Sequence, residues 1–353
     1  MDGDRRYPGP QVCREHRGHS RRCTGAVLMI SKVGVIGAGS MGTAIAQSIS
    51  RRAGEVIVFG RRQAVVDSIN RDNCNSRYFP GLRLNPNIRA RLMGDRLDVV
   101  DCAAVVIAVP SSEVRSIVSA AHEDLAGKFL VTVAKGLEYP SLKTMSEIIR
   151  DETGNPNMAC FSGPTFADEI AYGHIAGATI GAGGDPSLRA TISDLFGEFI
   201  LDFSDDIRAV ELCGVLKNVY AIGTGMWDSV YSNHNEHYTF LNMCYKEMCT
   251  FLRAISLDEG IFTKFCCFGD FNLTANVDKS RNRTLGLMVG KKIVKTPYLE
   301  SGVTFEGSRS VKGIIELAEN HDIDMPIARF VYDVLSGNNN VRESVDGLIR
   351  KAP

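Results

Sequence analysis

The sequence has little that would connect it to a membrane or to a nucleic acid. No apolar run reaches the roughly 18 residues that a membrane-spanning helix needs, so we expect no integral membrane association. Forty basic and 41 acidic residues leave a net charge of only −1. Because nothing global attracts a polyanion, we expect no nucleic-acid partner. An anionic ligand would have to be held by local charges.

Paired cysteines and metal-ligand motifs are also missing. The ten cysteines include no C-x-x-C pair, and several lie in apolar segments, where a free thiol behaves as a small hydrophobe. This usage predicts a reducing, cytoplasmic location. Cys266-Cys267 fits either redox chemistry or simple packing. His234–His237 offers two histidines without a third ligand, so we expect a polar loop and no metal. No Ser/His/Asp set and no Walker phosphate loop is present.

Residues 1–28 differ in composition from the rest of the chain. They are rich in Arg, Gly and Pro and lack the apolar core of a secretory signal. We interpret them as a disordered extension or as a mis-assigned start, with Met29 as the natural first residue. A chain of 353 residues favours two further domains.

The clearest motif is Lys32–Ala46, KVGVIGAGSMGTAIA, which predicts a buried strand, a glycine turn and a helix. Gly37, Gly39 and Gly42 have the G-x-G-x-x-G spacing. These glycines permit a tight turn, a close approach of a pyrophosphate and close packing of the helix on the strand. The free N–H groups at the helix start would face the phosphates. The alternative is a glycine turn that binds no nucleotide.

The second expected strand, Glu55–Arg62, bears on the choice of cofactor. A Rossmann unit often has Asp or Glu at the end of this strand, where it binds the ribose 2′-hydroxyl. Here the residues are Gly60, Arg61 and Arg62. Two guanidiniums suit a 2′-phosphate, so the sequence favours NADP(H), with NAD(H) possible. The alternative is two solvated arginines on a loop.

The remaining pattern changes from strands to helices near residue 210. The expected strands are Val105–Val109, Phe129–Ala134, Met158–Phe161, Ile175–Ala182 and a segment near Phe199–Phe203. The expected helices are Glu211–Gly223, Thr239–Ile255, Arg309–Glu319 and Ile327–Ser336. We therefore predict an α/β Rossmann domain, with a doubly wound and mostly parallel sheet, over residues 29–209. An all-α domain follows over residues 210–353.

Five segments contain candidate site residues. Lys135 and the turn 162–167 follow strands, at the edge where such sheets bind ligands. Lys217 lies in an apolar helix, where a desolvated lysine can serve as a general acid or base; an ordinary snorkelling lysine is the alternative. Arg281 could bind a phosphate by paired hydrogen bonds, although KSRNR also fits a solvated basic loop. Asp270 also fits a simple Gly-Asp turn.

Together these segments resemble the bacterial type of NAD(P)-dependent glycerol-3-phosphate dehydrogenases. The matching blocks run in order from about Lys32 to Ile327: GAGSMGTAIA, FGRR, NSRYFPGLRL, VIAVPS, AKGLE, SGPTFADEI, ELCGVLKNVYAIGTG, FGDFNLT, KSRNR and FEGSRSVKGI. The resemblance implies reversible NAD(P)H-dependent reduction of dihydroxyacetone phosphate to sn-glycerol 3-phosphate. It also implies a supply of glycerol 3-phosphate for phospholipid synthesis, and a homodimer.

The resemblance assigns roles by position, with Lys217 as the catalytic proton acceptor. The implied substrate-binding residues are Lys135, Gly163, Thr165, Lys217, Asp270, Ser280, Arg281 and Asn282. With the glycine loop and the arginine pair, the cofactor-binding residues are Gly37, Gly39, Ser40, Met41, Gly42, Arg61, Arg62, Lys135, Ala167, Arg281 and Glu306.

The sequence departs from the family pattern in two places. Ser232–Met248 replaces an alanine-rich stretch that usually contains Thr-Arg-Gly, and Met243 stands where the arginine would be. Phe265–Phe268 replaces a Gly/Ala-rich segment. These bulkier residues leave open a paralogue that acts on another small phosphorylated or phosphonate alcohol. A non-catalytic NADP(H)-binding protein is the alternative outside enzymes. A β-hydroxyacid dehydrogenase is disfavoured because Lys217 and Asn218 are adjacent.

Overall fold

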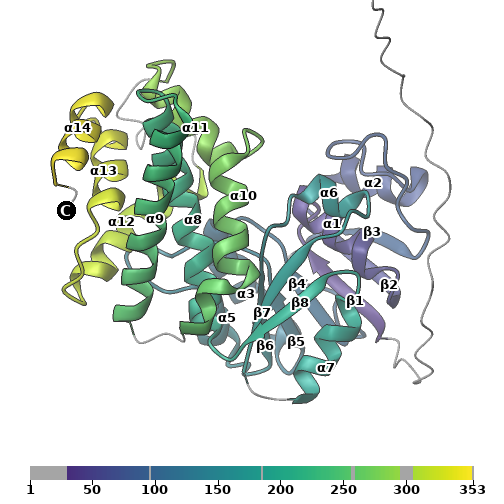
Figure 1. Cartoon of the computed structure of the whole chain (residues 1–353). Helices are drawn as coiled ribbons and strands as arrows, with labels where there is room; N and C mark the ends of the chain where they lie inside the picture. The colour runs from purple at the N-terminus through teal and green to yellow at the C-terminus, as the bar shows by residue number, and fades with distance from the viewer. Residues whose placement is uncertain (1–29, 95–96, 184–185, 256–258, 295–304, 352–353) are drawn as a thin grey trace, which may run out of the picture.

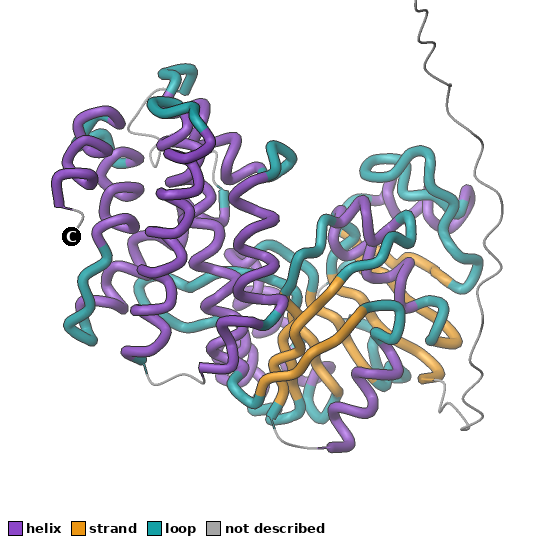
Figure 2. Tube along the Cα trace, viewed as in Figure 1, coloured by secondary structure: helices purple, strands orange, loops and turns teal. Residues whose placement is uncertain are grey.

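A computed structural model of the chain describes residues 30–94, 97–183, 186–255, 259–294 and 305–351. The described chain folds into a sheet-containing part and a helical bundle that lie side by side (Figures 1 and 2). The extension 1–28 and the proposed start at Met29 lie outside the described residues. None of the described helices combines the length and apolar content that a membrane crossing would need.

The N-terminal part is built on one eight-stranded sheet with the order β3-β2-β1-β4-β5-β6-β7-β8. All neighbouring pairs are parallel except β6 with β7, which confirms the predicted mostly parallel sheet. The strands are β1 (Ile30–Ile36), β2 (Ala53–Gly60), β3 (Ile88–Leu92), β4 (Ala104–Ile107), β5 (Phe129–Thr132), β6 (Met158–Ser162), β7 (Gly177–Ala182) and β8 (Ile200–Ser204).

Helices cover both faces of this sheet because alternate residues of each strand point to opposite sides. In β1, Val33 and Val35 belong to one core and Ile36 to the other. The first core is completed by α1 (Ser40–Ile49), α2 (Gln63–Asp72) and α7 (Pro186–Leu195). The second is completed by α3 (Ser111–Ala120), α4 (His122–Leu125) and α5 (Met145–Thr153). The short α6 (Ala167–Ala171) packs on α1.

The C-terminal part is entirely helical in its described residues, as the sequence predicts. Its centre is α8 (Ile207–Asp228), which is buried from Ala209 to Trp227. A helix that is apolar on all sides belongs in the interior of a bundle. Around it lie α9 (His234–Ala254), η1 (Glu259–Thr263), the π-helical η2 (Phe265–Gly269), α10 (Asp270–Asn276), α11 (Arg281–Gly290), α12 (Glu306–Glu319), α13 (Pro326–Leu335) and α14 (Val341–Lys351).

Close packing fixes α8 against its neighbours. A Cβ on Gly225 would lie 2.1 Å from the Arg283 carbonyl oxygen of α11, and one on Gly286 would lie 2.0 Å from the Ile222 carbonyl oxygen. No larger residue fits at either position without moving a backbone. The tight crossing therefore holds the middle of α8, and the polar residues in it, at a defined depth.

A buried carboxylate joins α8 to the Rossmann part. Glu211 accepts hydrogen bonds from the Ser146 backbone N–H at 2.8 Å and from the Ser146 hydroxyl at 2.6 Å, at the start of α5. Burial raises the pKa of Glu211 to about 7. The helix N-terminus supplies the N–H donor and a favourable dipole. Because α8 begins at Ile207, the expected domain boundary at residues 209–210 falls within its first turn.

Candidate active site

Two lysines share one buried aspartate where the bundle meets the sheet. Lys217 Nζ of α8 lies 2.7 Å from Asp270 Oδ1, and Lys135 Nζ lies 2.6 Å from Asp270 Oδ2. Lys135 follows β5, and Asp270 is the first residue of α10. Asp270 is 1% exposed and Lys217 is 8% exposed. The alternatives of a snorkelling lysine and a simple Gly-Asp turn are both wrong.

Burial and the charges of this cluster together set the pKa of Lys217. Burial lowers its pKa to about 8, and the Lys135 ammonium acts in the same direction. The Asp270 carboxylate opposes both effects because it stabilises the ammonium form. A lysine with this pKa exchanges protons readily near neutral pH, which suits a general acid or base.

Two further polar groups, which the sequence reading missed or left without a role, complete the cluster. Thr274 accepts a hydrogen bond from Lys217 Nζ at 2.9 Å and donates to Asp270 Oδ1 at 3.3 Å. It lies one helical turn after Asp270, so the i, i+4 spacing could have revealed it. Asn218 accepts from the Asn282 side chain at 2.9 Å. This contact brings one residue of the KSRNR segment beside the turn of α8 that contains Lys217.

The turn after β6 forms a wall beside Lys135. Lys135 Nζ lies 3.4 Å from the Gly163 carbonyl oxygen, which also accepts from the Thr165 hydroxyl at 2.9 Å. A Cβ on Gly163 would lie 2.5 Å from the Gly177 carbonyl oxygen, so this position requires glycine. The structure thus brings the predicted residues Lys135, Gly163 and Thr165 into contact.

The KSRNR segment is the start of a helix, and the solvated-loop alternative is wrong. Ser280 is the N-cap of α11 and accepts from the Arg283 backbone N–H at 3.4 Å. Arg283 pairs with Asp228 at 2.5 Å and is mostly buried. Arg281, the first residue of α11, is exposed and forms no ion pair within the described parts of the chain. A free guanidinium at a helix N-terminus is suited to a phosphate.

A pocket of about 390 Å³ lies beside the glycine turn at the carboxyl edge of the sheet, and we call it the dinucleotide pocket after the ligand that the sequence predicts. Gly37 has φ +116°, and a Cβ there would lie 2.6 Å from the Ala108 carbonyl oxygen. A Cβ on Gly42 would lie 1.8 Å from the Gly37 carbonyl oxygen, so α1 packs directly on the turn. Gly39, by contrast, faces open space at the start of α1. A diphosphate can therefore approach the N–H groups there.

The arginine pair lies on the same pocket. Arg61 and Arg62 both line it. Gly60 has no room for a side chain, because a Cβ there would lie 2.9 Å from the Ala38 Cβ. Arg62 is exposed, and Arg61 forms an ion pair with Glu113 of α3 at 2.7 Å. Gly60 thus stands where an acidic residue commonly binds the ribose, and two cations follow it.

The other predicted cofactor residues lie at helix starts. Ser40 and Met41 begin α1, and Ala167 begins α6, which packs on α1. Glu306 begins α12 and accepts from the Ser111 hydroxyl at the start of α3. Glu306 therefore connects the bundle to the sheet close to Gly136, where a Cβ would lie 3.5 Å from its carboxylate.

The predicted polar loop at His234–His237 is wrong, since these residues begin α9. His237 lies 2.9 Å from Asp228 and 2.6 Å from Asn276 Oδ1, so it serves as a packing contact in the bundle. Within the described ranges, no three His, Cys, Asp or Glu side chains are grouped to hold a metal ion.

The residues that depart from the family pattern lie in α9 and in η2, which directly precedes Asp270. Met243 packs on the helical core, and Cys266 and Cys267 are fully buried. The Phe265 ring lies against Gly177, where a Cβ would approach it to 2.7 Å. Phe268 is 55% exposed and contacts the Tyr245 ring. The Lys217–Asp270 pair forms despite these substitutions.

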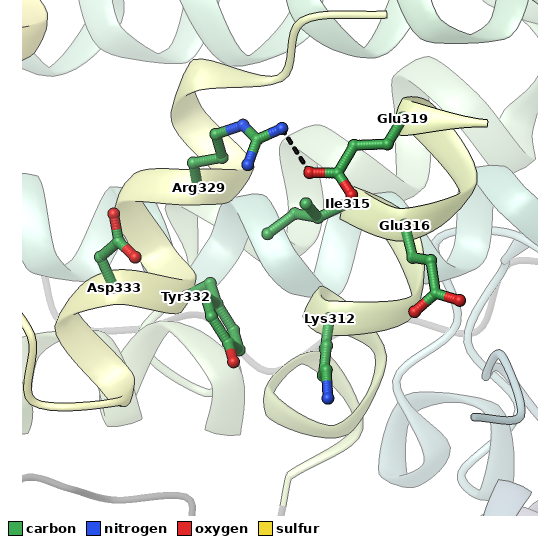
Figure 3. Close-up of a pocket in the computed structure, with 7 residues that line it drawn as sticks. All are labelled: Lys312, Ile315, Glu316, Glu319, Arg329, Tyr332 and Asp333. Atoms are coloured by element: carbon green, nitrogen blue, oxygen red, sulfur yellow. Dashed lines mark hydrogen bonds and ion pairs between the residues drawn. The ribbon is translucent and has the colours of Figure 1, made fainter. Parts of the chain in front are cut away.

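A second hollow, of about 220 Å³, lies between α12 and α13 (Figure 3). Its walls are charged, and Arg329 pairs with Glu319 across it at 2.7 Å. Lys312 lies over the Tyr139 ring, 4.4 Å from its centre. None of the predicted site residues lines this hollow, so the site residues and the dinucleotide pocket lie elsewhere.

Comparisons with known proteins find relatives of one family along most of the chain. Family models described as the N-terminus and C-terminus of NAD-dependent glycerol-3-phosphate dehydrogenase match residues 32–186 and 206–346. The chain is 43% identical over 311 residues to the glycerol-3-phosphate dehydrogenase (NAD(P)+) of Methanothermobacter thermautotrophicus, covering 88% of this chain and 94% of that protein. It is 31% identical over 327 residues to the same-named protein of Nitratidesulfovibrio vulgaris, covering 91% and 98%.

A solved structure supports the fold. The crystal structure of glycerol-3-phosphate dehydrogenase from Coxiella burnetii aligns with a TM-score of 0.80 at 24% identity, covering 92% of this chain and 100% of that chain. Both regions of the fold are therefore shared with that protein.

Proposed function

The chain belongs to the NAD-dependent glycerol-3-phosphate dehydrogenase family, and on this premise we propose that it reduces dihydroxyacetone phosphate to sn-glycerol 3-phosphate reversibly. It is an oxidoreductase that uses a nicotinamide cofactor. The observation that carries the proposal is the buried Lys217–Asp270–Lys135 cluster, in the same fold as a pocket lined by the glycine turn and two arginines.

The residues of this chain would bind, orient and protonate the substrate. The reduced nicotinamide supplies the hydride when it is bound. Lys217 Nζ, as an ammonium, gives a proton to the carbonyl oxygen as that oxygen gains negative charge; in the reverse direction the neutral amine accepts the hydroxyl proton. Asp270 and Thr274 hold Nζ in position through contacts of 2.7 and 2.9 Å. Lys135 adds positive potential beside the developing oxyanion.

Phosphate recognition falls to the start of α11. Arg281 supplies a guanidinium with no competing carboxylate among the described residues, and the N–H groups of the helix start add to its field. Asn282 is oriented by Asn218, the neighbour of Lys217. The phosphate and the reacting carbonyl would thus be held by residues whose positions are coupled through α8 and α11.

The first experiment mixes the purified chain with NADPH and dihydroxyacetone phosphate and follows loss of the reduced cofactor, with a repeat using NADH. Rapid oxidation that depends on the phosphate ester supports the proposed function. Binding of the cofactor without oxidation would instead favour a paralogue with another substrate or a non-catalytic NADP(H)-binding protein.

We propose that NADP(H) is preferred and that NAD(H) is also accepted. Arg61 and Arg62 face the dinucleotide pocket at the end of β2, where an acidic residue would favour the free 2′-hydroxyl of NAD(H). The ratio of kcat/KM for NADPH and NADH in the same assay tests this preference.

The rate of reduction is expected to fall as the pH rises through about 8, the pKa of Lys217. Reduction requires the ammonium form, which is lost above its pKa, whereas oxidation requires the amine and should rise through the same pH. The measurement is kcat/KM in both directions between about pH 7 and 9.5, a range above the second ionisation of the phosphate. Opposite slopes with one shared inflection are the expected result.

Asp270→Asn provides the internal check on this profile. Removing the carboxylate removes the group that raises the pKa of Lys217, so the inflection should move to lower pH. Asp322→Asn, which changes an exposed carboxylate after α12, should leave the inflection unchanged. An inflection that stays fixed in Asp270→Asn would separate the pH dependence from Lys217.

We further propose a homodimer in the cytoplasm that supplies glycerol 3-phosphate to phospholipid synthesis. The dimer and the metabolic role rest on the family resemblance. The location is supported by eight described cysteines, all of them free thiols and seven of them buried. Light scattering of the purified chain measures the oligomeric state directly.

A further inference from the structure

A carboxylate with no role in the chemistry lies beside the cofactor pocket. Glu113 is in the first turn of α3, which follows β4, and Arg61 follows β2. Their side chains meet at 2.7 Å between Arg61 Nη1 and Glu113 Oε2. Because β1 lies between β2 and β4, the ion pair spans the carboxyl edge of the sheet above β1, where the glycine turn begins.

The pair changes the charge available to a ligand in this pocket. Arg61 and Arg62 both line the pocket, and Glu113 neutralises one of the two cations. The side chain of Arg61 is 61% exposed and that of Glu113 is 35% exposed, so a ligand can reach both. A guanidinium has five N–H donors, and only Nη1 contacts Glu113. Arg61 therefore still has N–H donors for a ligand, while the Glu113 carboxylate opposes its positive charge.

We propose that Glu113 is a specificity-determining residue that limits the preference for the 2′-phosphate of NADP(H). The inference rests on the proposed use of a nicotinamide dinucleotide. A 2′-phosphate dianion near Arg61 would interact unfavourably with the Glu113 carboxylate, whereas the neutral 2′-hydroxyl of NAD(H) would not. Glu113 thus narrows the difference in affinity between NADPH and NADH, so that the chain can use both.

The test is Glu113→Gln, which keeps the size of the side chain and an oxygen acceptor for Arg61 but removes the charge. Dissociation constants for NADPH and NADH are measured without substrate, from the fluorescence of the reduced nicotinamide. We expect the constant for NADPH to fall on the order of three- to tenfold, and that for NADH to stay within about twofold. The gain in NADPH affinity should shrink at about 0.5 M salt, because salt screens exposed charges. Glu343→Gln, an exposed change in α14, serves as the matched control.

Two results would overturn the role of Glu113 without touching the proposed function. Equal changes for both cofactors would show that its charge does not act at the 2′ position. Weaker binding of NADPH would show that Glu113 instead holds Arg61 in place for the phosphate. Binding of neither cofactor by the unaltered chain would overturn this inference and the proposed function together. Binding without reduction of dihydroxyacetone phosphate would overturn only the proposed function, because the affinities are measured without turnover.

Discussion

Replacing Lys217 with alanine is expected to lower kcat for dihydroxyacetone phosphate by about 10²- to 10⁴-fold, the range typical of a lost general acid. Affinity for NADPH should stay within about twofold, since Lys217 is not among the residues that line the dinucleotide pocket. The Asp270 carboxylate keeps Lys135 as a partner at 2.6 Å, so it is not left as an unpaired buried charge. The measurement combines steady-state rates with cofactor binding by fluorescence.

Two variants at the same position separate proton transfer from packing. Lys217→Met keeps most of the side-chain volume in the buried α8 and guards against a folding defect. It should be as inactive as Lys217→Ala. Added methylammonium should restore part of the rate to the alanine variant, which leaves space for it, but not to the methionine variant. Lys143→Ala, which removes an exposed pairing with Asp151, should retain activity within about twofold. Near-normal turnover by either Lys217 variant would contradict the assigned role.

The features that the sequence predicted correctly are those fixed by neighbouring residues. The strand, turn and helix at Lys32–Ala46 follow from local hydrophobicity and glycine geometry, and the structure shows Gly37 in a positive-φ turn. The change from sheet to bundle near α8 follows from helical periodicity. β3 was missed because IRARL in Ile88–Leu92 alternates apolar residues with arginines over only five residues. Such a short edge strand is recognisable mainly by its pairing with β2.

Contacts between distant segments could not be predicted from residue patterns alone. Asp270 is 53 residues from Lys217 and 135 from Lys135, and only the packing of α8 and α10 against the sheet brings the three together. Residue patterns therefore left Asp270 open as a turn former, and the family resemblance was needed to place it at the substrate. The Arg61–Glu113 pair depends on how α3 is rotated after β4, which no local pattern specifies.

Replacing Arg281 with alanine is expected to raise the KM for dihydroxyacetone phosphate about 10²-fold. A charge-assisted bond from a guanidinium contributes about 1.5–3 kcal/mol, and a bidentate contact to phosphate lies at the upper end of that range. Arg281 is exposed, and its removal leaves no described carboxylate without a partner, so stability should change little. The measurement is KM and kcat for the phosphate ester, together with the thermal midpoint of unfolding.

The substrate without its phosphate shows whether the loss belongs to phosphate binding. Dihydroxyacetone should be reduced poorly, and at the same rate by the unaltered chain and by Arg281→Ala. This substrate has no phosphate that the guanidinium could bind. Arg150→Ala, an exposed change in the last turn of α5, should leave both substrates unaffected. Arg281 is also predicted to contact the cofactor, and the loss of that contact would weaken NADPH binding in the variant. The contrary result is that NADPH affinity falls as much as the KM for dihydroxyacetone phosphate rises, and that reduction of dihydroxyacetone also slows. In that case Arg281 acts on the cofactor, and the phosphate must be bound elsewhere. Loss confined to the phosphate ester places the phosphate at the start of α11, beside the turn of α8 that contains Lys217.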